Sequence, residues 1–217
     1  MKKNLTIFTL ATFLAGAPTI CLSQLPSFGG LGPKHPVANA GGDLSGQQTS
    51  LVRSYVAGGK NVLFSQSKLL EALGLKDQAA TAQATANSLS EGATTQNLQD
   101  ADKVQSANST ALADALKNQN APLDAQSKQT YTQGLALLAA GLIKYAGMRQ
   151  DITGFSKGLA GPGAVQAVKK LQSGVFIITT LPSSISNTIS TLNSALSFAK
   201  SHGIEVPPDA TAALTQG

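Results

Sequence analysis

The hydrophobic residues of this chain recur mainly at spacings of three and four, the period of helices that bury one face. The pattern begins after residue 43 and predicts helices over residues 45–74, 76–90, 95–118, a segment ending at 158, 164–180 and 183–201. Short polar or glycine-containing links separate them. The pattern therefore predicts an all-α protein, an antiparallel bundle of five or six helices.

Two helices carry the clearest apolar stripes. In the fourth helix the stripe alternates spacings of four and three, with Arg149 in one of its positions: Tyr131, Leu135, Leu138, Leu142, Tyr145 and Ile152. In the last helix it runs through Ile185, Ile189, Leu192, Leu196 and Ala199. Such heptad seams form where one helix lies along another, so we expect these two helices to be the central pair.

Glycine and polar positions modify this pattern. Gly134 and Gly141 are seven residues apart on one face, which predicts close approach of a neighbouring backbone. Gly58 and Gly59 interrupt the first helix, where each costs about 1 kcal/mol relative to alanine. Residues 45–48, Ser-Gly-Gln-Gln, match a capping box at its start.

Pro182 leaves one alternative open, because it either separates the last two helices or kinks a single long one. Residues 175–180 are β-branched enough to form a strand. We favour a helix here, because an isolated strand would have nothing to pair with.

The ends of the chain lack helical periodicity. Residues 24–42 are rich in proline and glycine and predict a flexible leader, and residues 204–217, with Pro207 and Pro208, predict a flexible tail. The helical domain is thus expected to span residues 43–203.

The first 23 residues are typical of a secretory signal peptide. Lys2 and Lys3 precede an apolar run, Leu5–Ala17, and Ser23 is a small residue suited to cleavage before Gln24. The run has 13 residues, fewer than the roughly 17–25 needed to span a bilayer. We therefore expect a secreted or periplasmic protein, with lipidation at Cys21 as the alternative.

Composition limits the chemistry. Cys21 is the only cysteine, so cleavage after Ser23 leaves a chain without thiols, disulfides or thiolate metal sites. Loss of Lys2 and Lys3 lowers the net charge from +5 to +3. Residues 144–203 hold six basic residues and one acid, Asp151, but the lysines are scattered, as on an ordinary solvated surface.

Two enzyme motifs occur without the residues that complete them. Gly154, Ser156 and Gly158 match the G-x-S-x-G elbow of α/β-hydrolases, but no acid lies between Ser156 and His202. Ser65 with Lys68, and Ser197 with Lys200, match the S-x-x-K motif of penicillin-binding proteins, but no Lys-Thr-Gly occurs. We nominate no catalytic residue and expect no enzyme.

Metal, cofactor and nucleic-acid sites are not predicted either. His35 and His202 have no second ligand at helical spacing, and Asp100 and Asp102 are expected to be solvated. No phosphate-binding glycine loop and no basic–aromatic alternation occurs.

These features predict a non-enzymatic bacterial protein that binds a partner protein, a peptide or an envelope component through a helical face. The alternative is a membrane-active bundle that inserts into or associates with anionic lipid. It is motivated by the apolar runs 134–143 and 174–181 and by the basic second half. The sequence leaves the oligomeric state open.

Overall fold

The computed structural model describes residues 43–119, 122–161 and 168–215, within one unit, Ala38–Gly217. The predicted signal peptide and leader lie outside these residues. The helices are α1 (Leu44–Ala72), α2 (Lys76–Ser88), α3 (Thr95–Asn118), α4 (Ala125–Gly147), α5 (Arg149–Leu159), the 3₁₀ turn η1 (Val168–Lys170), α7 (Gln172–Ser201) and α8 (Pro208–Ala213). The described residues contain no strand, and the predicted all-α antiparallel bundle is confirmed.

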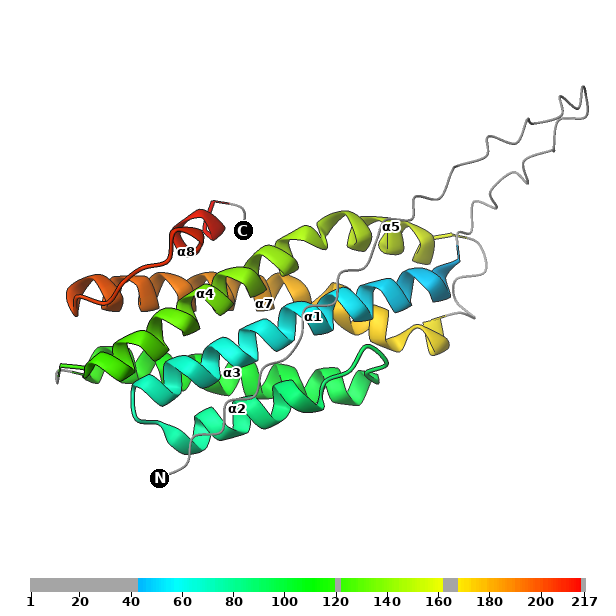
Figure 1. Cartoon of the computed structure of the whole chain (residues 1–217). Helices are drawn as coiled ribbons and strands as arrows, with labels where there is room; N and C mark the ends of the chain where they lie inside the picture. The colour runs from blue at the N-terminus through cyan, green and yellow to red at the C-terminus, as the bar shows by residue number, and fades with distance from the viewer. Residues whose placement is uncertain (1–42, 120–121, 162–167, 216–217) are drawn as a thin grey trace, which may run out of the picture. The chain divides into compact units, whose positions relative to one another are not determined.

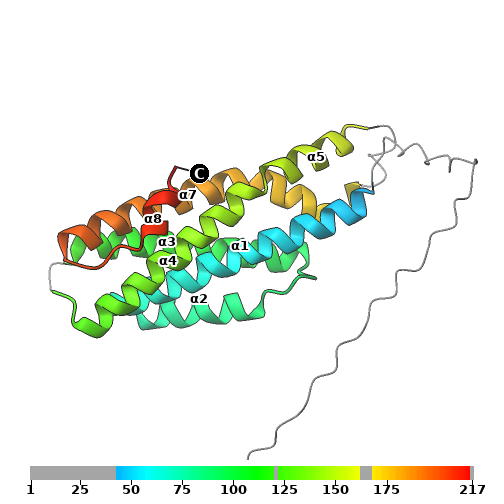
Figure 2. The ribbon, with the colours of Figure 1, turned by 45° about the horizontal axis from the view of Figure 1, so that its top comes forward.

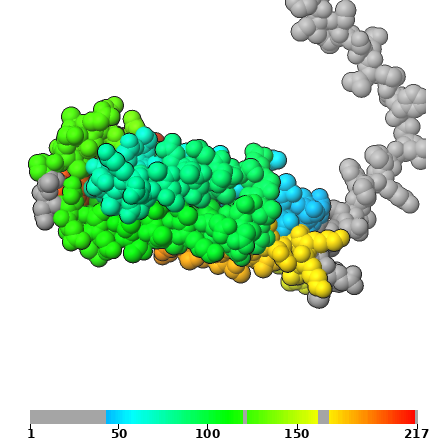
Figure 3. All heavy atoms as spheres, turned by 90° about the horizontal axis from the view of Figure 1, so that it is seen from below, coloured from blue at the N-terminus to red at the C-terminus, as the bar shows by residue number. Residues whose placement is uncertain are grey.

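Helices α1 to α4 alternate in direction, α5 continues in the direction of α4, and α7 runs back (Figure 1). As a result α1, α3 and α7 run parallel to one another, and α2 and α4 run the opposite way. Seen from below, α2 and α3 cover much of one face (Figure 3). The predicted bounds of α2 and α3 agree with the structure to within two residues.

The central pair differs from the prediction. The α4 stripe is buried as expected, but the most extensive contact of α4 is with α1 and that of α7 is with α3. A Cβ added at Gly134 would lie 2.8 Å from Leu69 Cδ2, and one at Gly141 would lie 3.2 Å from the Val62 backbone nitrogen. The predicted close backbone approach is therefore confirmed, with α1 as the neighbour.

The glycines of α1 belong to the same contact. A Cβ at Gly58 would lie 2.6 Å from Cδ1 of Tyr145, whose ring stacks on Tyr55 with centroids 5.4 Å apart. Gly58 and Gly59 are both buried within the continuous helix α1. Their cost in helix propensity is thus offset by the space they give to a fully buried tyrosine.

Three helix boundaries differ from expectation. The predicted fourth helix is divided at Met148, so that Arg149, which occupies a seam position, begins α5 and stays exposed. The last helix begins at Gln172 rather than 164 and continues through Pro182; residues 164–167 lie outside the described part. Proline removes one backbone hydrogen bond, but the packed faces on both sides keep the helix continuous.

The start of α1 is not a capping box. Ser45 lies inside the helix, and the Gln48 side chain instead reaches α7, where Oε1 accepts a hydrogen bond from the Gly174 amide at 3.0 Å. Gln48 Nε2 donates to the Lys170 carbonyl at 3.3 Å. This one side chain therefore satisfies an amide in the first turn of α7.

The C-terminal segment is packed rather than flexible over its described residues, 204–215. Ile204, Ala210 and Ala213 are buried, and α8 lies against α4 (Figure 2). Thr132 Oγ1 donates to the Glu205 carbonyl at 3.0 Å. Pro208 occupies the first turn of α8, where proline is well tolerated, so the two prolines begin a helix instead of a flexible tail.

Candidate functional site: a polar seam and groove between α3 and α7

Polar residues occupy core positions where α1, α3 and α7 meet. The buried face of α3 follows the spacing three, four, three, four, with Gln105 and Asn108 in the middle: Leu98, Ala101, Gln105, Asn108 and Leu112. The facing positions of α7 are Ser184, Thr188 and Thr191, and Gln66 comes from α1. We call these six polar side chains the polar seam.

Amide hydrogen bonds join α1 to α3 within the seam. Gln66 Nε2 donates to the Gln105 carbonyl at 2.9 Å and to Ser109 Oγ at 3.1 Å. Asn108 Nδ2 donates to Gln66 Oε1 at 3.4 Å, and the Tyr145 hydroxyl donates to Gln105 Oε1 at 3.3 Å. Buried polar groups cost stability unless they are paired, and these bonds pair most of them.

A second set of contacts links α1, α3 and α7 through Ser184. Its Oγ lies 3.5 Å from the Tyr55 hydroxyl and 3.4 Å from Asp102 Oδ1. Burial raises the pKa of Asp102, and the hydrogen bond from Ser184 partly opposes this rise. Asp102 is therefore half-buried against α7, whereas the sequence predicted a solvated carboxylate.

Burial also raises the pKa of two tyrosines that contact the polar seam, Tyr55 and Tyr145. It raises the pKa of Tyr55 to about 12 and that of Tyr145 well above its usual value of 10.0. Both hydroxyls thus stay protonated at neutral pH and act as hydrogen-bond partners.

A small cavity lies inside the seam. It measures about 10 Å³ and is lined by Leu138 and Val62 on its apolar side and by seam residues on the other. Gln105 Nε2 is buried and has no hydrogen-bond partner within the described chain. The cavity is close to the smallest that holds one water molecule, which would supply an acceptor for this amide.

The cavity leads outward into a groove along the surface between α3 and α7. Ser106, Ser109, Asn187 and Thr191 line both the cavity and a hollow of about 420 Å³. A further hollow of about 390 Å³ shares Ala113, Leu116, Lys117 and Ser194 with it and ends at the stacked rings of Phe198 and His202. We call this surface the α3–α7 groove.

The α3–α7 groove is lined by many polar side chains, and its lining as a whole carries little net charge. Among the described residues that line it, Asp114 and Lys117 carry charge, and the imidazole of His202 lies at its end. The side chains of Ser106, Asn187, Ser190 and Ser194 have no hydrogen-bond partner among the described residues. They are available to a ligand.

The structure separates the residues of both enzyme motifs. Ser156 is exposed on helix α5 and follows no strand, because the segment before it is also helical. Ser65 is buried and donates to the Gly134 carbonyl at 2.7 Å, while Lys68 pairs with Glu71 at 3.5 Å. Ser197 donates to the carbonyl of Asn193 in its own helix.

The residues considered as possible metal ligands also lie apart from one another. Asp100 lies near Lys103, Asp102 faces Ser184, and His202 bonds the Phe198 carbonyl. His35 lies outside the described residues. Over residues 43–119, 122–161 and 168–215, no three histidine, cysteine or acidic side chains lie close enough to hold a metal ion.

Sequence reasoning missed the seam although its signal is present. The apolar residues Leu98, Ala101, Leu112 and Ala115 mark one face of α3, and the same spacing passes through Gln105 and Asn108. In α7 the expected stripe is buried at Leu192, Leu196 and Ala199. In the preceding two turns Ser184 and Thr188 are buried instead, while Ile185 and Ile189 lie at the edge of the core. Hydrophobicity alone therefore predicted the wrong buried residues in that part of α7.

Fold and site together define a helical bundle with a polar interior seam and a surface groove of low net charge. Comparisons with protein-family models, curated proteins and solved structures found no match to this chain. None of the described helices is both long and apolar enough to span a membrane.

Proposed function

We propose that this chain is a non-enzymatic protein of the bacterial cell envelope that binds a partner protein, a peptide or an envelope polymer through the α3–α7 groove. The observation that carries the proposal is the row of unpaired polar side chains along the groove, among them Ser106, Asn187, Ser190 and Ser194. Groups of this kind bond a polar ligand in place of water. The low charge of the groove favours a ligand recognised by hydrogen bonds rather than by long-range attraction.

A photo-crosslinking residue tests the groove directly. It is placed at Ser194 in the groove and, as a matched control, at Gln83, an exposed position on α2. We expect one envelope component to be crosslinked from Ser194 only, and to be lost when Ser190→Arg fills the groove. Equal labelling from both positions, or labelling that survives Ser190→Arg, would contradict the proposal.

Export is the second part of the proposal. It rests on the basic start, the apolar run and the small residue Ser23. Intact mass and N-terminal sequencing of the protein from fractionated cells should give a chain beginning at Gln24. A chain retaining Met1 would refute export by this route, and a lipid on Cys21 would establish the alternative.

Two observations favour the membrane-active alternative. Ile143 is 38% exposed on α4, and an apolar groove lies beside Arg149 between α5 and α7. Flotation of the whole protein with liposomes containing anionic lipid, at two salt concentrations, tests it. Absence of association at both concentrations would exclude this function.

A further inference from the structure

The helical backbone is weakened at three places in the middle of the bundle. In α1 the weak point is the buried pair Gly58–Gly59, because glycine has a lower helix propensity than alanine. Between α4 and α5 it is the turn at Met148, whose amide donates to the Tyr145 carbonyl, three residues back, at 3.2 Å. In α7 it is Pro182, which has no amide proton to donate to the Ile178 carbonyl.

Contacts between the helices place these three points side by side. A Cβ added at Gly58 would lie 2.6 Å from Cδ1 of Tyr145, which is three residues before Met148. Arg149, the residue after Met148, and Pro182 both line one hollow of about 410 Å³ between α5 and α7. The three points therefore share one transverse level of the bundle. We call it the hinge level; it consists of Gly58–Gly59, Met148 and Pro182.

The helix segments beyond the hinge level pack into one body. We call this body the α5 end; it consists of residues 44–57, 149–159, 168–170 and 172–181. Phe155 of α5 is fully buried, and a Cβ added at Gly174 would lie 2.5 Å from its Cζ. The Gln48 side chain bonds the Gly174 amide and the Lys170 carbonyl, at 3.0 and 3.3 Å. These contacts hold α1, α5, η1 and α7 together within the α5 end.

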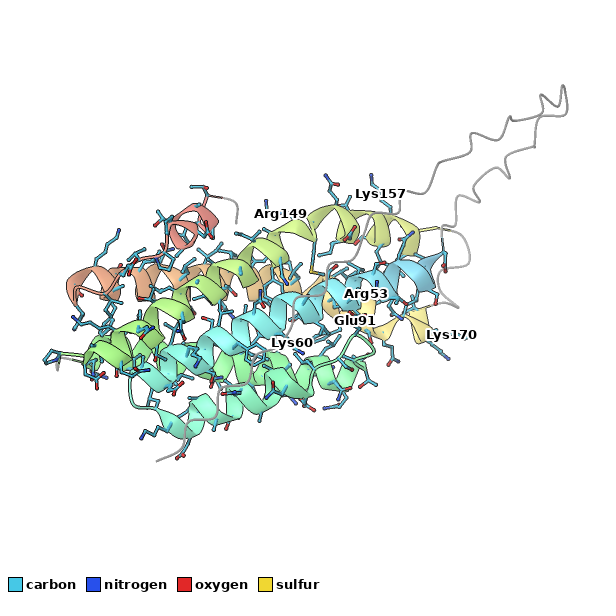
Figure 4. All side chains as sticks on the ribbon, viewed as in Figure 1. Arg53, Lys60, Glu91, Arg149, Lys157 and Lys170 are labelled. Carbon is cyan, nitrogen blue, oxygen red and sulfur yellow. The ribbon has the colours of Figure 1, made fainter. Side chains whose placement is uncertain are left out.

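The α5 end is less well covered than the rest of the bundle. The starts of α1 and α7 extend beyond α2 and α3, which leave them uncovered on the face shown in Figure 3. Arg53 pairs with Glu91 at 3.0 Å (Figure 4), but both side chains are more than half exposed, and exposed ion pairs contribute little. Thr95, at the start of α3, meets Ser173 through their hydroxyls at 3.0 Å. Contacts of this kind tolerate a movement of the α5 end.

Hydroxyl side chains weaken α7 further on both sides of Pro182. Thr179 Oγ1 donates to the Val175 carbonyl at 3.0 Å, and Ser184 Oγ donates to the Thr180 carbonyl at 3.2 Å. Hydroxyl bonds to the carbonyl four residues back often bend a helix, and proline is a frequent site of kinks. Residues 175–184 are therefore the part of α7 that bends most easily.

The polar contacts between helices next to the hinge level are long. Ser184 Oγ lies 3.5 Å from the Tyr55 hydroxyl and 3.4 Å from Asp102 Oδ1, compared with about 2.7–2.8 Å for most O–H···O bonds. A small movement breaks or shortens such bonds at little cost.

We propose that the α5 end bends as one body about the hinge level, so that the protein exchanges between a straight and a bent form. Hinges in proteins are a few residues that absorb the backbone change between bodies that stay rigid. The apolar core is continuous across the hinge level, so the motion is a bend that keeps the core closed. The proposal depends on the backbone and packing of the α5 end and is independent of the ligand of the α3–α7 groove.

Spin-label distance distributions of the full chain carrying Cys21→Ser test the proposal, because the introduced cysteines are then its only thiols. Each pair of labels occupies exposed positions. One pair lies within the α5 end, at Thr49 and Ser156; one lies within the rest of the bundle, at Gln83 and Gln129; and one spans the hinge level, at Gln129 and Ser156. We expect the pair that spans the hinge level to give a broader distribution than either of the other two pairs.

Pro182→Ala tests the role of the hinge level. The alanine amide can bond the Ile178 carbonyl, and Pro182 is exposed, so little packing is lost. We expect the additional width across the hinge level to be lost in this variant. Pro208→Ala is the matched control: Pro208 lies in the first turn of α8, where proline costs no hydrogen bond, so all three distributions should stay unchanged. Circular dichroism checks that each labelled variant is folded.

Three results would overturn the proposal. The first is an equal width for all three pairs, which would mean that the bundle is rigid. The second is a pair within the α5 end as broad as the pair that spans the hinge level, which would mean that this end frays instead of bending as one body. The third is a spanning distribution that Pro182→Ala leaves unchanged or that Pro208→Ala narrows equally. Crosslinking from Ser194 in the α3–α7 groove is unaffected by any of these outcomes.

Discussion

Substitution of Gly141 by alanine tests the contact between α1 and α4. The added methyl group would lie 2.7 Å from Val62 Cγ2, 3.2 Å from the Val62 nitrogen and 3.3 Å from the Gly58 carbonyl oxygen. The last two are backbone atoms of a helix and cannot rotate away. The whole α1–α4 pair must therefore separate slightly to admit the methyl group.

The magnitude follows from two opposing effects. Overpacking costs about 1–3 kcal/mol, and the backbone contacts place Gly141→Ala near the upper end. Helix propensity returns about 1 kcal/mol, since Gly141 is interior to α4. We expect the free energy of unfolding to fall by about 2 kcal/mol.

Gly154→Ala is the matched control. Gly154 is interior to α5, and a Cβ there would meet nothing within 4 Å, so only the propensity gain of up to about 1 kcal/mol applies. The two variants should thus differ by about 3 kcal/mol, or roughly 6–12 °C in Tm. Urea and thermal unfolding followed by circular dichroism measure both.

A double mutant locates the clash. Val62→Ala removes the nearest side-chain atom, so part of the loss caused by Gly141→Ala should be recovered when the two are combined. If Gly141→Ala is as stabilising as Gly154→Ala, the close α1–α4 contact does not exist and the reasoning fails.

Three further predictions use the same unfolding measurements. Leu138→Ala and Leu192→Ala, both fully buried, should each cost roughly 2–5 kcal/mol, and values near zero would mean that neither position is in the core. Gln66→Ala should cost at least about 2 kcal/mol, because Asn108 Nδ2 loses its acceptor and the Gln105 carbonyl and the Ser109 hydroxyl each lose a hydrogen bond; a neutral result would show that the seam amides are solvated. The pKa of Asp102 is raised in the folded state, so the protein binds more protons folded than unfolded, and this carboxyl lowers stability as pH rises from the unfolded pKa through the folded pKa. Asp102→Asn should remove that fall, and an unchanged pH profile between wild type and variant would contradict the assignment.

Helix period and punctuation predict most of this fold. Short links separate α2 from α1, which ends at Ala72, and from α3, which begins at Thr95. Gly203, whose φ is 61°, ends α7 as its position predicts. Helix period alone does not predict which helix each apolar stripe packs against. The α4 stripe fits against any wide apolar face, and what selects α1 is the pairing of Gly134 and Gly141 with α1 backbone, which no single helix reveals.

The candidate site was harder to predict for a related reason. Gln105 and Asn108 hold positions that an apolar stripe would fill, and a reading by hydrophobicity passes over them. Asp102 looks solvated on α3 alone, and only the parallel course of α7 brings Ser184 to it.

The polar seam and the α3–α7 groove have different explanations. Truncating a single buried amide such as Gln66 costs stability, but well-packed apolar side chains in place of a whole polar cluster often stabilise a core as well or better. Their bonds join α1 to α3 at one register, because a shift of one turn would leave each amide unpaired. The need to fix the register of α1 and α3 explains the buried polar residues without any bound ligand. It does not extend to the side chains of Ser190 and Ser194, which have no hydrogen-bond partner in the described chain and fix no register, so the binding proposal depends on exposed groups of this kind.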